Sequence, residues 1–258
     1  TLAGGVLAAF LGPFIARNTR DLVATPFLAS FAALVGIALL AAGIGVFLRL
    51  PVPPRPEAGR PPRRLREIAR LGDFRLAVAG GAVGYAVMGL LMTATPLAML
   101  CVRHDFAATA TVIQWHLVAM FAPSFVTGLL IGRIGVLQTM LAGGALVLAG
   151  IGVALSGEAI PHFGVALALV GVGWNFLYVG ATTLLTQTCH DEEKPAVQAF
   201  NDSVVFLSVT LATLGAAWLV DELGWATVNR LAAVPVLLLM AGVLGALWRR
   251  RAGLASAA

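Results

Sequence analysis

Long apolar runs separated by short charged segments dominate the chain. Each run carries at most one Asp, Glu, Lys or Arg, and each is longer than the roughly 20 residues that cross a bilayer as a helix. The seven runs are Leu22–Leu48, Leu76–Val102, Phe106–Gly132, Ile134–Gly157, Ala159–Cys189, Pro195–Val220 and Leu223–Trp248. The pattern therefore predicts seven transmembrane helices.

Thr1–Ala16 is a shorter eighth run. It falls just below the usual spanning length, and the chain opens on Thr1 rather than Met, so we expect it to belong to a helix of a longer protein. It lacks a basic n-region, which argues against a cleavable signal peptide. The fold class predicted is all-α integral membrane, with about eight transmembrane helices.

Composition agrees with a membrane protein. The chain is 59% hydrophobic and 11% charged, whereas a soluble domain carries about a quarter charged residues. The excess of basic residues lies in short loops beside apolar runs, so we expect its partner to be the anionic membrane surface and not nucleic acid.

The basic residues also predict an orientation. If the loops alternate in side, 13 of the 17 lysines and arginines fall on one side, in Arg49–Arg75, Arg133, Lys194 and Arg249–Arg251. The positive-inside rule makes that side cytoplasmic. We expect a multi-pass protein of a bacterial-type inner membrane with a cytoplasmic C-terminus.

A basic linker divides the chain unevenly. Residues 1–48 would form the last two spans of an N-terminal bundle, 49–75 a cytoplasmic linker, 76–250 a six-helix C-terminal bundle and 251–258 a tail. The linker begins with a proline-rich, extended segment. It continues with Leu65, Ile68 and Leu71 on one helical face and arginines on the other, which indicates an interfacial helix; a plain basic loop is the alternative.

The end of the third long run carries a motif, Gly128-Leu-Leu-Ile-Gly-Arg-Ile-Gly. With the two-bundle organisation, it resembles the major facilitator superfamily, whose members have about twelve spans in two halves joined by a cytoplasmic linker. Gly128, Arg133 and Gly135 match the family's loop motif, and Gly132 replaces its aspartate. The resemblance implies a gating or packing role for these residues, and the alternative is a simple helix contact through Gly-x-x-x-Gly.

A second motif, Gly12-Pro13, lies near the end of the first run, on a ridge of small residues that begins at Gly4 and Ala8. It is similar to part of the fifth-span motif of drug/proton antiporters, although Arg17 stands where a glycine is expected. The resemblance then makes the chain spans five to twelve of a secondary transporter. It implies alternating access for a small solute, with proton-coupled export as one hypothesis and import as another.

In this family spans seven and ten line the central cavity, so their polar faces are candidates for substrate contact. Span ten carries Trp174 and a stripe with helical spacing, Asn175, Tyr178, Thr182 and Thr186. Span seven carries Tyr85, Met88, Met92 and Thr95 before Pro96. The alternatives are interhelical hydrogen bonding for the first stripe and ordinary core packing for the second.

Span eight adds Gln114 as a cavity candidate and His116 as a candidate proton relay, because an imidazole titrates near neutral pH. Asp202 is the one carboxylate inside a span, and an intramembrane acid is costly enough to suggest function. It could bind a proton, a cation or a gate arginine, or it could be solvated near the interface.

Other classes of protein are less well supported. The sequence has no Gly-x-Ser, no His-Glu-x-x-His and no second intramembrane aspartate, so we predict no enzyme, metal site or cofactor. Cys101 and Cys189 should lie at opposite faces, too far apart for a disulfide. We expect a monomer, and a non-transporting receptor or scaffold of the same fold is the remaining alternative.

Overall fold

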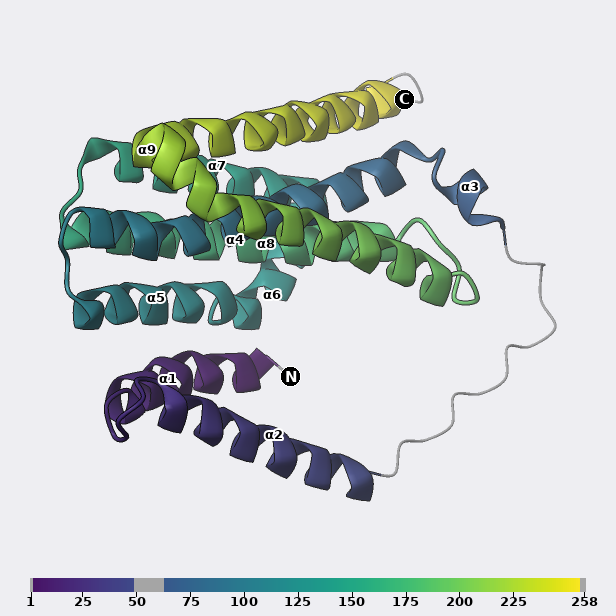
Figure 1. Ribbon diagram of the computed structural model, residues 1–258. Helices are drawn as coiled ribbons and strands as arrows, with labels where there is room; N and C mark the ends of the chain where they lie inside the picture. Colours follow the sequence, from purple (N-terminus) through teal and green to yellow (C-terminus); the bar gives the residue numbers. More distant parts are fainter. Residues whose placement is uncertain (1, 49–62, 256–258) are drawn as a thin grey trace.

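The computed structural model describes residues 2–48 and 63–255, in which every regular element is a helix (Figure 1). The predicted proline-rich start of the linker and the end of the tail lie outside the described residues. The helices are α1 (Leu2–Thr19), α2 (Leu28–Phe47), α3 (Leu65–Ile68), α4 (Gly72–Cys101), α5 (Phe106–Phe121), α6 (Ser124–Ile134), α7 (Val136–Ser156), α8 (Ile160–Thr186) and α9 (Lys194–Ala255).

Five of the described helices, α2, α4, α7, α8 and α9, are long and apolar enough to cross a membrane, and the bent pair α5–α6 makes a sixth candidate. The 62 residues of α9 would measure about 93 Å at 1.5 Å per residue, three times the hydrocarbon core of a bilayer. Gly224, with φ of 74°, breaks α9 where the ribbon turns back (Figure 1). Its two halves correspond to the last two predicted spans.

The run Phe106–Gly132 is not one straight helix. α5 and α6 meet at an angle of 42°, with Ala122 and Pro123 between them. Pro123 has no N–H to continue the hydrogen-bond ladder, which is why the helix breaks at this position.

α8 lies at the centre of the bundle and packs against α4, α5 and α7. Glycines bring α7 and α8 close together: a Cβ at Gly143 would lie 2.8 Å from the Gly173 carbonyl oxygen, and one at Gly173 would lie 2.7 Å from that of Gly143. Small residues allow such backbone approach in membrane bundles. α4 and α9 form the other extensive helix contact.

α1 packs along α5. Gly5 lies against the Phe121 ring, and Phe10 meets Trp115 edge-to-face at 6.4 Å. The predicted ridge of small residues points elsewhere, since a Cβ at Gly4 or Gly12 would meet no described atom within 4 Å. The face of α1 that makes the contact is therefore offset by one residue from that ridge.

The end of the predicted linker packs on the bundle. Ile68 is 1% exposed and Leu65 lies against the core, while Leu71 is exposed. The apolar face predicted to lie in the membrane interface thus contacts protein through Leu65 and Ile68. α4 begins at Gly72, four residues before the apolar run that predicted it.

Candidate functional site

Aromatic rings from four helices meet on one side of α8. Trp174 and Tyr178, one turn apart on α8, stack at 5.4 Å with an interplanar angle of 6°. Tyr85 of α4 places its ring edge-to-face against both, with centroids 5.0 Å away in each case. Phe121 of α5 packs against Trp174, and Phe206 of α9 against Tyr85. We call these five residues the aromatic cluster.

The rings of the aromatic cluster differ in their exposure to solvent. Trp174 is 4% exposed, Tyr85 and Tyr178 are half-buried, and Phe206 is 59% exposed. The cluster therefore has an accessible apolar surface, formed by Tyr85, Tyr178 and Phe206, and the buried Trp174 ring packs beneath it. Gly84 lies at the contact between α4 and α8, where a Cβ would be in van der Waals contact with Leu177 at 3.4 Å.

Asp202 of α9 lies beside this surface. It is exposed and within Coulombic range of the Tyr85 and Tyr178 hydroxyls. Its Oδ1 accepts a hydrogen bond from Asn201 Nδ2 at 3.2 Å. The candidate carboxylate and the aromatic cluster thus belong to one region of the bundle.

Asn175 occupies a different environment from its neighbours in the predicted stripe. It is 1% exposed, and its Nδ2 donates to the Met120 carbonyl at 2.7 Å and to Ser124 Oγ at 2.5 Å. Its Oδ1 accepts from Thr127 Oγ1 at 2.7 Å. These groups flank the break at Pro123, so Asn175 supplies hydrogen bonds at an interrupted backbone and presents no free polar group.

The other stripe residues bond locally. The Thr182 hydroxyl donates to the carbonyl of Tyr178 and the Thr186 hydroxyl to that of Thr183. On α4, Met88 and Thr95 are buried and Met92 is half-buried. The burial of Met88 and Thr95 agrees with the alternative that these residues pack in the core. Of that stripe, Tyr85 joins the aromatic cluster.

His116 is fully buried between α5 and α8. Its Nδ1 lies 2.6 Å from the Leu167 carbonyl oxygen, which can only accept, so Nδ1 carries the proton. Nε2 has no partner among the described residues. A Cβ at Gly171 would lie 2.9 Å from the His116 carbonyl oxygen, so this glycine allows the close contact.

Gln114 connects two parts of the chain. Its Oε1 accepts from Arg17 Nη2 of α1 at 2.9 Å, and Arg17 Nη1 donates to Thr111 Oγ1 at 3.4 Å. Gln114 is thus placed in the α1–α5 contact and away from the aromatic cluster. The sequence did not indicate a role for Arg17 beyond its charge.

The residues of the loop motif are spread over a helix end. Gly135, with φ of 95°, forms the turn between α6 and α7, a backbone conformation that favours glycine. Gly128 and Arg133 are exposed, and a Cβ at Gly128 would meet no described atom within 4 Å. Among the described residues of this motif, only Gly135 occupies a position where the structure explains the need for glycine.

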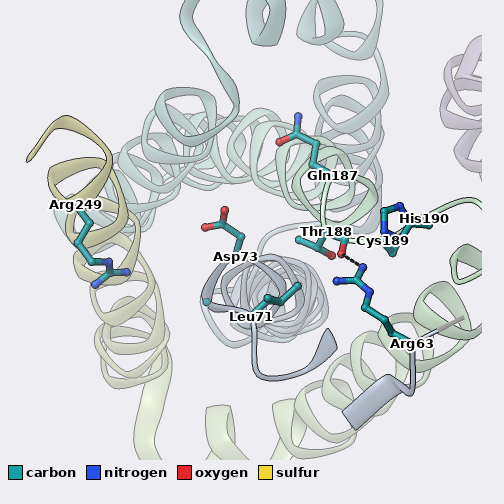
Figure 2. A pocket seen from close by; sticks show the side chains of 9 residues that line it. Arg63, Leu71, Asp73, Gln187, Thr188, Cys189, His190 and Arg249 are labelled. Carbon is teal, nitrogen blue, oxygen red and sulfur yellow. Dashed lines mark hydrogen bonds between the residues drawn. The ribbon is translucent and has the colours of Figure 1, made fainter. Parts of the chain in front are cut away.

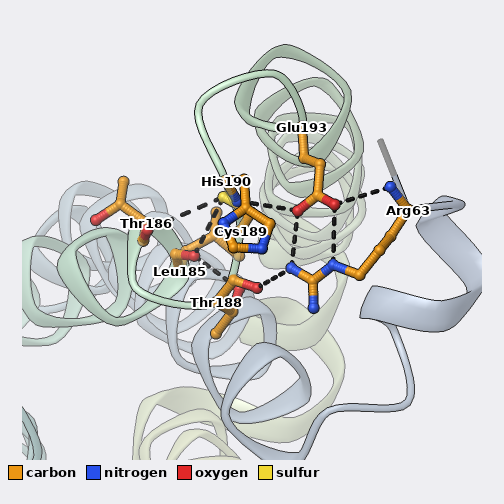
Figure 3. Close-up of polar contacts among 7 residues, drawn as sticks. All are labelled: Arg63, Leu185, Thr186, Thr188, Cys189, His190 and Glu193. Carbon is orange, nitrogen blue, oxygen red and sulfur yellow. Dashed lines mark hydrogen bonds and ion pairs between the residues drawn. The ribbon is translucent and has the colours of Figure 1, made fainter. Parts of the chain in front are cut away.

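An ion pair that the sequence did not predict attaches the linker to the bundle (Figure 3). Arg63 donates from its Nε and Nη2 to the two carboxylate oxygens of Glu193 at 2.9 and 2.8 Å, and its backbone N–H donates to the same group at 2.9 Å. Arg63 Nη2 also donates to the Thr188 carbonyl at 3.0 Å. The Glu193 side chain is 2% exposed.

The Arg63 guanidinium is the main reason that the pKa of Glu193 falls from 4.5 to about 2. Hydrogen bonds from the backbone N–H groups of His190 and Arg63 lower the pKa further, against the desolvation of the carboxyl group. Glu193 therefore stays ionised, and the contact between linker and bundle persists, at any pH near neutral.

Neither cysteine is in a disulfide, and the described part of the chain has no group of three or more His, Cys, Asp or Glu side chains that could hold a metal ion. An aromatic surface shared by four helices of a bundle is the kind of lining that small-molecule sites use.

The chain belongs to the Major Facilitator Superfamily, whose family profile matches residues 78–256. This confirms the family and the all-α membrane fold predicted from the sequence. The match supports the predicted class, a membrane transporter, over an enzyme.

Three relatives are similar to the chain. The riboflavin transporter RfnT of Brucella anthropi is 39% identical over 234 residues, which cover 88% of this chain and 58% of RfnT. The uncharacterized MFS-type transporters YdeG and YddS of Bacillus subtilis are 36% and 34% identical over 124 residues, or 47% of this chain and 29% and 28% of their own lengths. The chain thus spans less than two thirds of these relatives.

Proposed function

We propose that this chain is part of a secondary transporter for a flat heteroaromatic solute, with riboflavin as the first compound to test. The observation that carries the proposal is the aromatic cluster. Half-buried Tyr85 and Tyr178, beside exposed Phe206, offer ring faces and edges to a planar molecule. Each aromatic contact contributes about 0.5–1.5 kcal/mol beyond the area that it buries.

The resemblance to RfnT, named as a riboflavin transporter, supports the same substrate class. Riboflavin combines a planar three-ring system with a polar chain of hydroxyl groups. The aromatic cluster suits the ring system, and the nearby Asp202 carboxylate could accept hydrogen bonds from hydroxyl groups.

The contact between α1 and α5 supports alternating access, in which the two bundles rock about a central site. Arg17 reaches Thr111 and Gln114 at the end that the charge distribution assigns to the outside, and both hydrogen bonds lie at exposed positions. Exposed polar contacts of this kind are worth little, about 0–1 kcal/mol. Such a contact can form and break during each transport cycle.

For proton coupling, Asp202 is better placed than His116. Asp202 is exposed beside the aromatic cluster, so a proton can reach it when the site opens. His116 is covered and bonded to the backbone of α8, an arrangement that suits a structural role.

The test is flux of riboflavin in proteoliposomes that contain the whole protein, with lumiflavin and ribitol as competitors. Lumiflavin has the ring system without the polar chain, and ribitol has the chain without the rings. We expect saturable riboflavin flux that lumiflavin inhibits and ribitol does not. Inhibition by ribitol alone would overturn the aromatic proposal, and saturable binding without flux would favour the receptor alternative.

Import and export are distinguished in the same system. Flux is measured separately from each side of vesicles with one known protein orientation, with the pH gradient imposed in either direction. A proton-coupled importer accumulates riboflavin from the outer face when the outside is acidic. An exporter accumulates it from the cytoplasmic face of an inside-out vesicle when the lumen is acidic.

A further inference from the structure

We propose that a groove between α4 and the second half of α9 binds one anionic phospholipid, with its phosphate between Arg75 and Arg249 and an acyl chain along the groove. This proposal does not depend on the identity of the transported solute, because the groove lies apart from the aromatic cluster.

The groove has a volume of about 480 Å³ and is apolar along most of its length. Its walls are formed by Leu76, Ala79 and Val83 of α4 and by Pro235, Leu238 and Gly242 of α9. A Cβ at Gly242 would lie in ordinary van der Waals contact with Leu76 Cδ1 across the groove, at 3.4 Å. A longer side chain at position 242 would fill the space.

The length of the groove matches one leaflet of a bilayer. The eleven-residue step from Gly72 to Val83, both on its wall, covers about 17 Å at 1.5 Å per residue. Half of a hydrocarbon core of about 30 Å is about 15 Å. A chain that enters at the level of Gly72 therefore ends near the middle of the membrane.

Two cationic side chains lie at one end of this groove. Arg75, in the first turn of α4, and Arg249, near the end of α9, both line it. Neither forms an ion pair or a hydrogen bond with a residue in the described part of the chain, and the nearby Asp73 carboxylate is bonded to Arg250 at 2.8 Å. The charge distribution places this end on the cytoplasmic side, where anionic headgroups attract basic residues.

A polar pocket of about 520 Å³ adjoins the groove, and Arg249 and the Asp73 carboxylate are among the residues that line it (Figure 2). Gly72 and Arg249 border both spaces, and the far side of the pocket is formed by Thr188 and Arg63. It provides room for a headgroup, while arginine binds a phosphate through paired N–H groups. An apolar groove joined to unpaired arginines and a polar pocket matches an anionic phospholipid better than a free anion or an apolar solute.

The experiment measures how the purified whole protein retains phosphatidylglycerol and phosphatidylethanolamine, supplied in equal amounts, by native mass spectrometry. We expect phosphatidylglycerol to be preferred. The double variant Arg75→Gln/Arg249→Gln should bind it about 30-fold more weakly, taking roughly a fivefold loss per arginine. Gly242→Leu should reduce binding of phosphatidylglycerol while leaving the arginines in place.

Matched variants separate a site from diffuse charge. Arg66→Gln/Arg251→Gln removes the same charge from exposed positions outside the groove, and Gly36→Leu adds the same side chain to α2 where no described atom lies within 4 Å. Both should bind phosphatidylglycerol like the parent. A thermal unfolding midpoint close to that of the parent shows that each variant is folded.

Three results would overturn the proposal. The first is equal retention of the two lipids by the parent protein, and the second is an equal loss in the Arg66→Gln/Arg251→Gln control. The third is displacement of phosphatidylglycerol by soluble glycerol 3-phosphate at a similar concentration, which would identify an anion site without an acyl-chain groove.

Discussion

Two neighbouring faces of α8 carry polar residues that the sequence alone does not distinguish, and the structure gives them opposite environments. On one face, Asn175 is buried and its amide group bonds to three partners around the α5–α6 break. On the other, Trp174 and Tyr178 form part of an accessible aromatic surface. From this comparison we expect a polar group whose partners saturate it to affect stability, and an accessible one to affect binding.

The largest effect should come from Asp202, which α9 places beside the accessible face of α8. Asp202→Asn removes this carboxylate, so we expect pH-gradient-driven flux to be abolished while the protein still inserts and folds. Flux driven by a substrate gradient alone should continue. Unchanged pH-driven flux in proteoliposomes would exclude Asp202 from coupling.

The saturated face should respond in stability. Asn175→Leu removes three hydrogen bonds at about 0.6 kcal/mol each, so the free energy of unfolding should fall by about 2 kcal/mol, a roughly 30-fold change in the unfolding equilibrium. Denaturant titration in detergent measures this change, and the KM for riboflavin should not move.

Thr182→Val is the matched control for Asn175→Leu, because the Thr182 hydroxyl donates to the carbonyl of Tyr178, one turn earlier in its own helix. Its free energy of unfolding should change by less than about 0.5 kcal/mol. A large rise in KM in Asn175→Leu, with stability unchanged, would reverse the roles of the two faces.

A smaller effect should follow from the aromatic cluster itself. Tyr178→Leu removes a ring stacked on Trp174, and losing about 1 kcal/mol of aromatic interaction should raise the KM for riboflavin about fivefold. Tyr178→Phe keeps the ring and should behave like the parent, as should Trp218→Leu, which changes an exposed ring outside the aromatic cluster. Concentration-dependent flux measures all three, and an equal loss in Tyr178→Phe would assign the effect to the hydroxyl.

The smallest effect is expected at the Arg63–Glu193 ion pair, which lies outside both faces of α8 and holds the linker to the bundle. Because the pKa of Glu193 is lowered from 4.5 to about 2, its pairing with Arg63 stabilises α3 fully above pH 4.5 and is lost only as the pH falls toward 2. Hydrogen-exchange protection of Ile68 and Ala69 should therefore be constant between pH 5 and pH 8.

Glu193→Gln keeps the shape of that side chain but loses its charge. We expect protection of the same amides to fall about threefold, in the range of partly exposed ion pairs, with KM unchanged. A protection factor that varied strongly between pH 5 and pH 8 in the parent would contradict the low pKa.

The apolar runs were enough to predict where most of the helices lie, although not the break between α5 and α6, because a bilayer demands long stretches of hydrophobic residues whatever their partners. The predicted family was also confirmed. Helix periodicity was less informative about roles, because it placed Asn175, Tyr178 and Thr182 on one stripe. The family resemblance made Gln114 a cavity candidate, and that prediction did not include its hydrogen bond with Arg17 in the α1–α5 contact. The sequence did not predict that Phe121 and Phe206 belong to the aromatic cluster, because each is a single aromatic residue within an apolar run.

Sequence by itself thus determined that the chain crosses the membrane repeatedly and which family it belongs to, since these depend on local hydrophobicity, charge and short motifs. Only the tertiary structure decided which polar groups are saturated, which rings gather around Tyr85, and how Arg63 meets Glu193 across 130 residues of chain. Such contacts depend on how helices far apart in sequence approach one another. That approach depends on the bend at Pro123 and on close contacts such as those of Gly143 and Gly173, and the period of a single helix does not specify it.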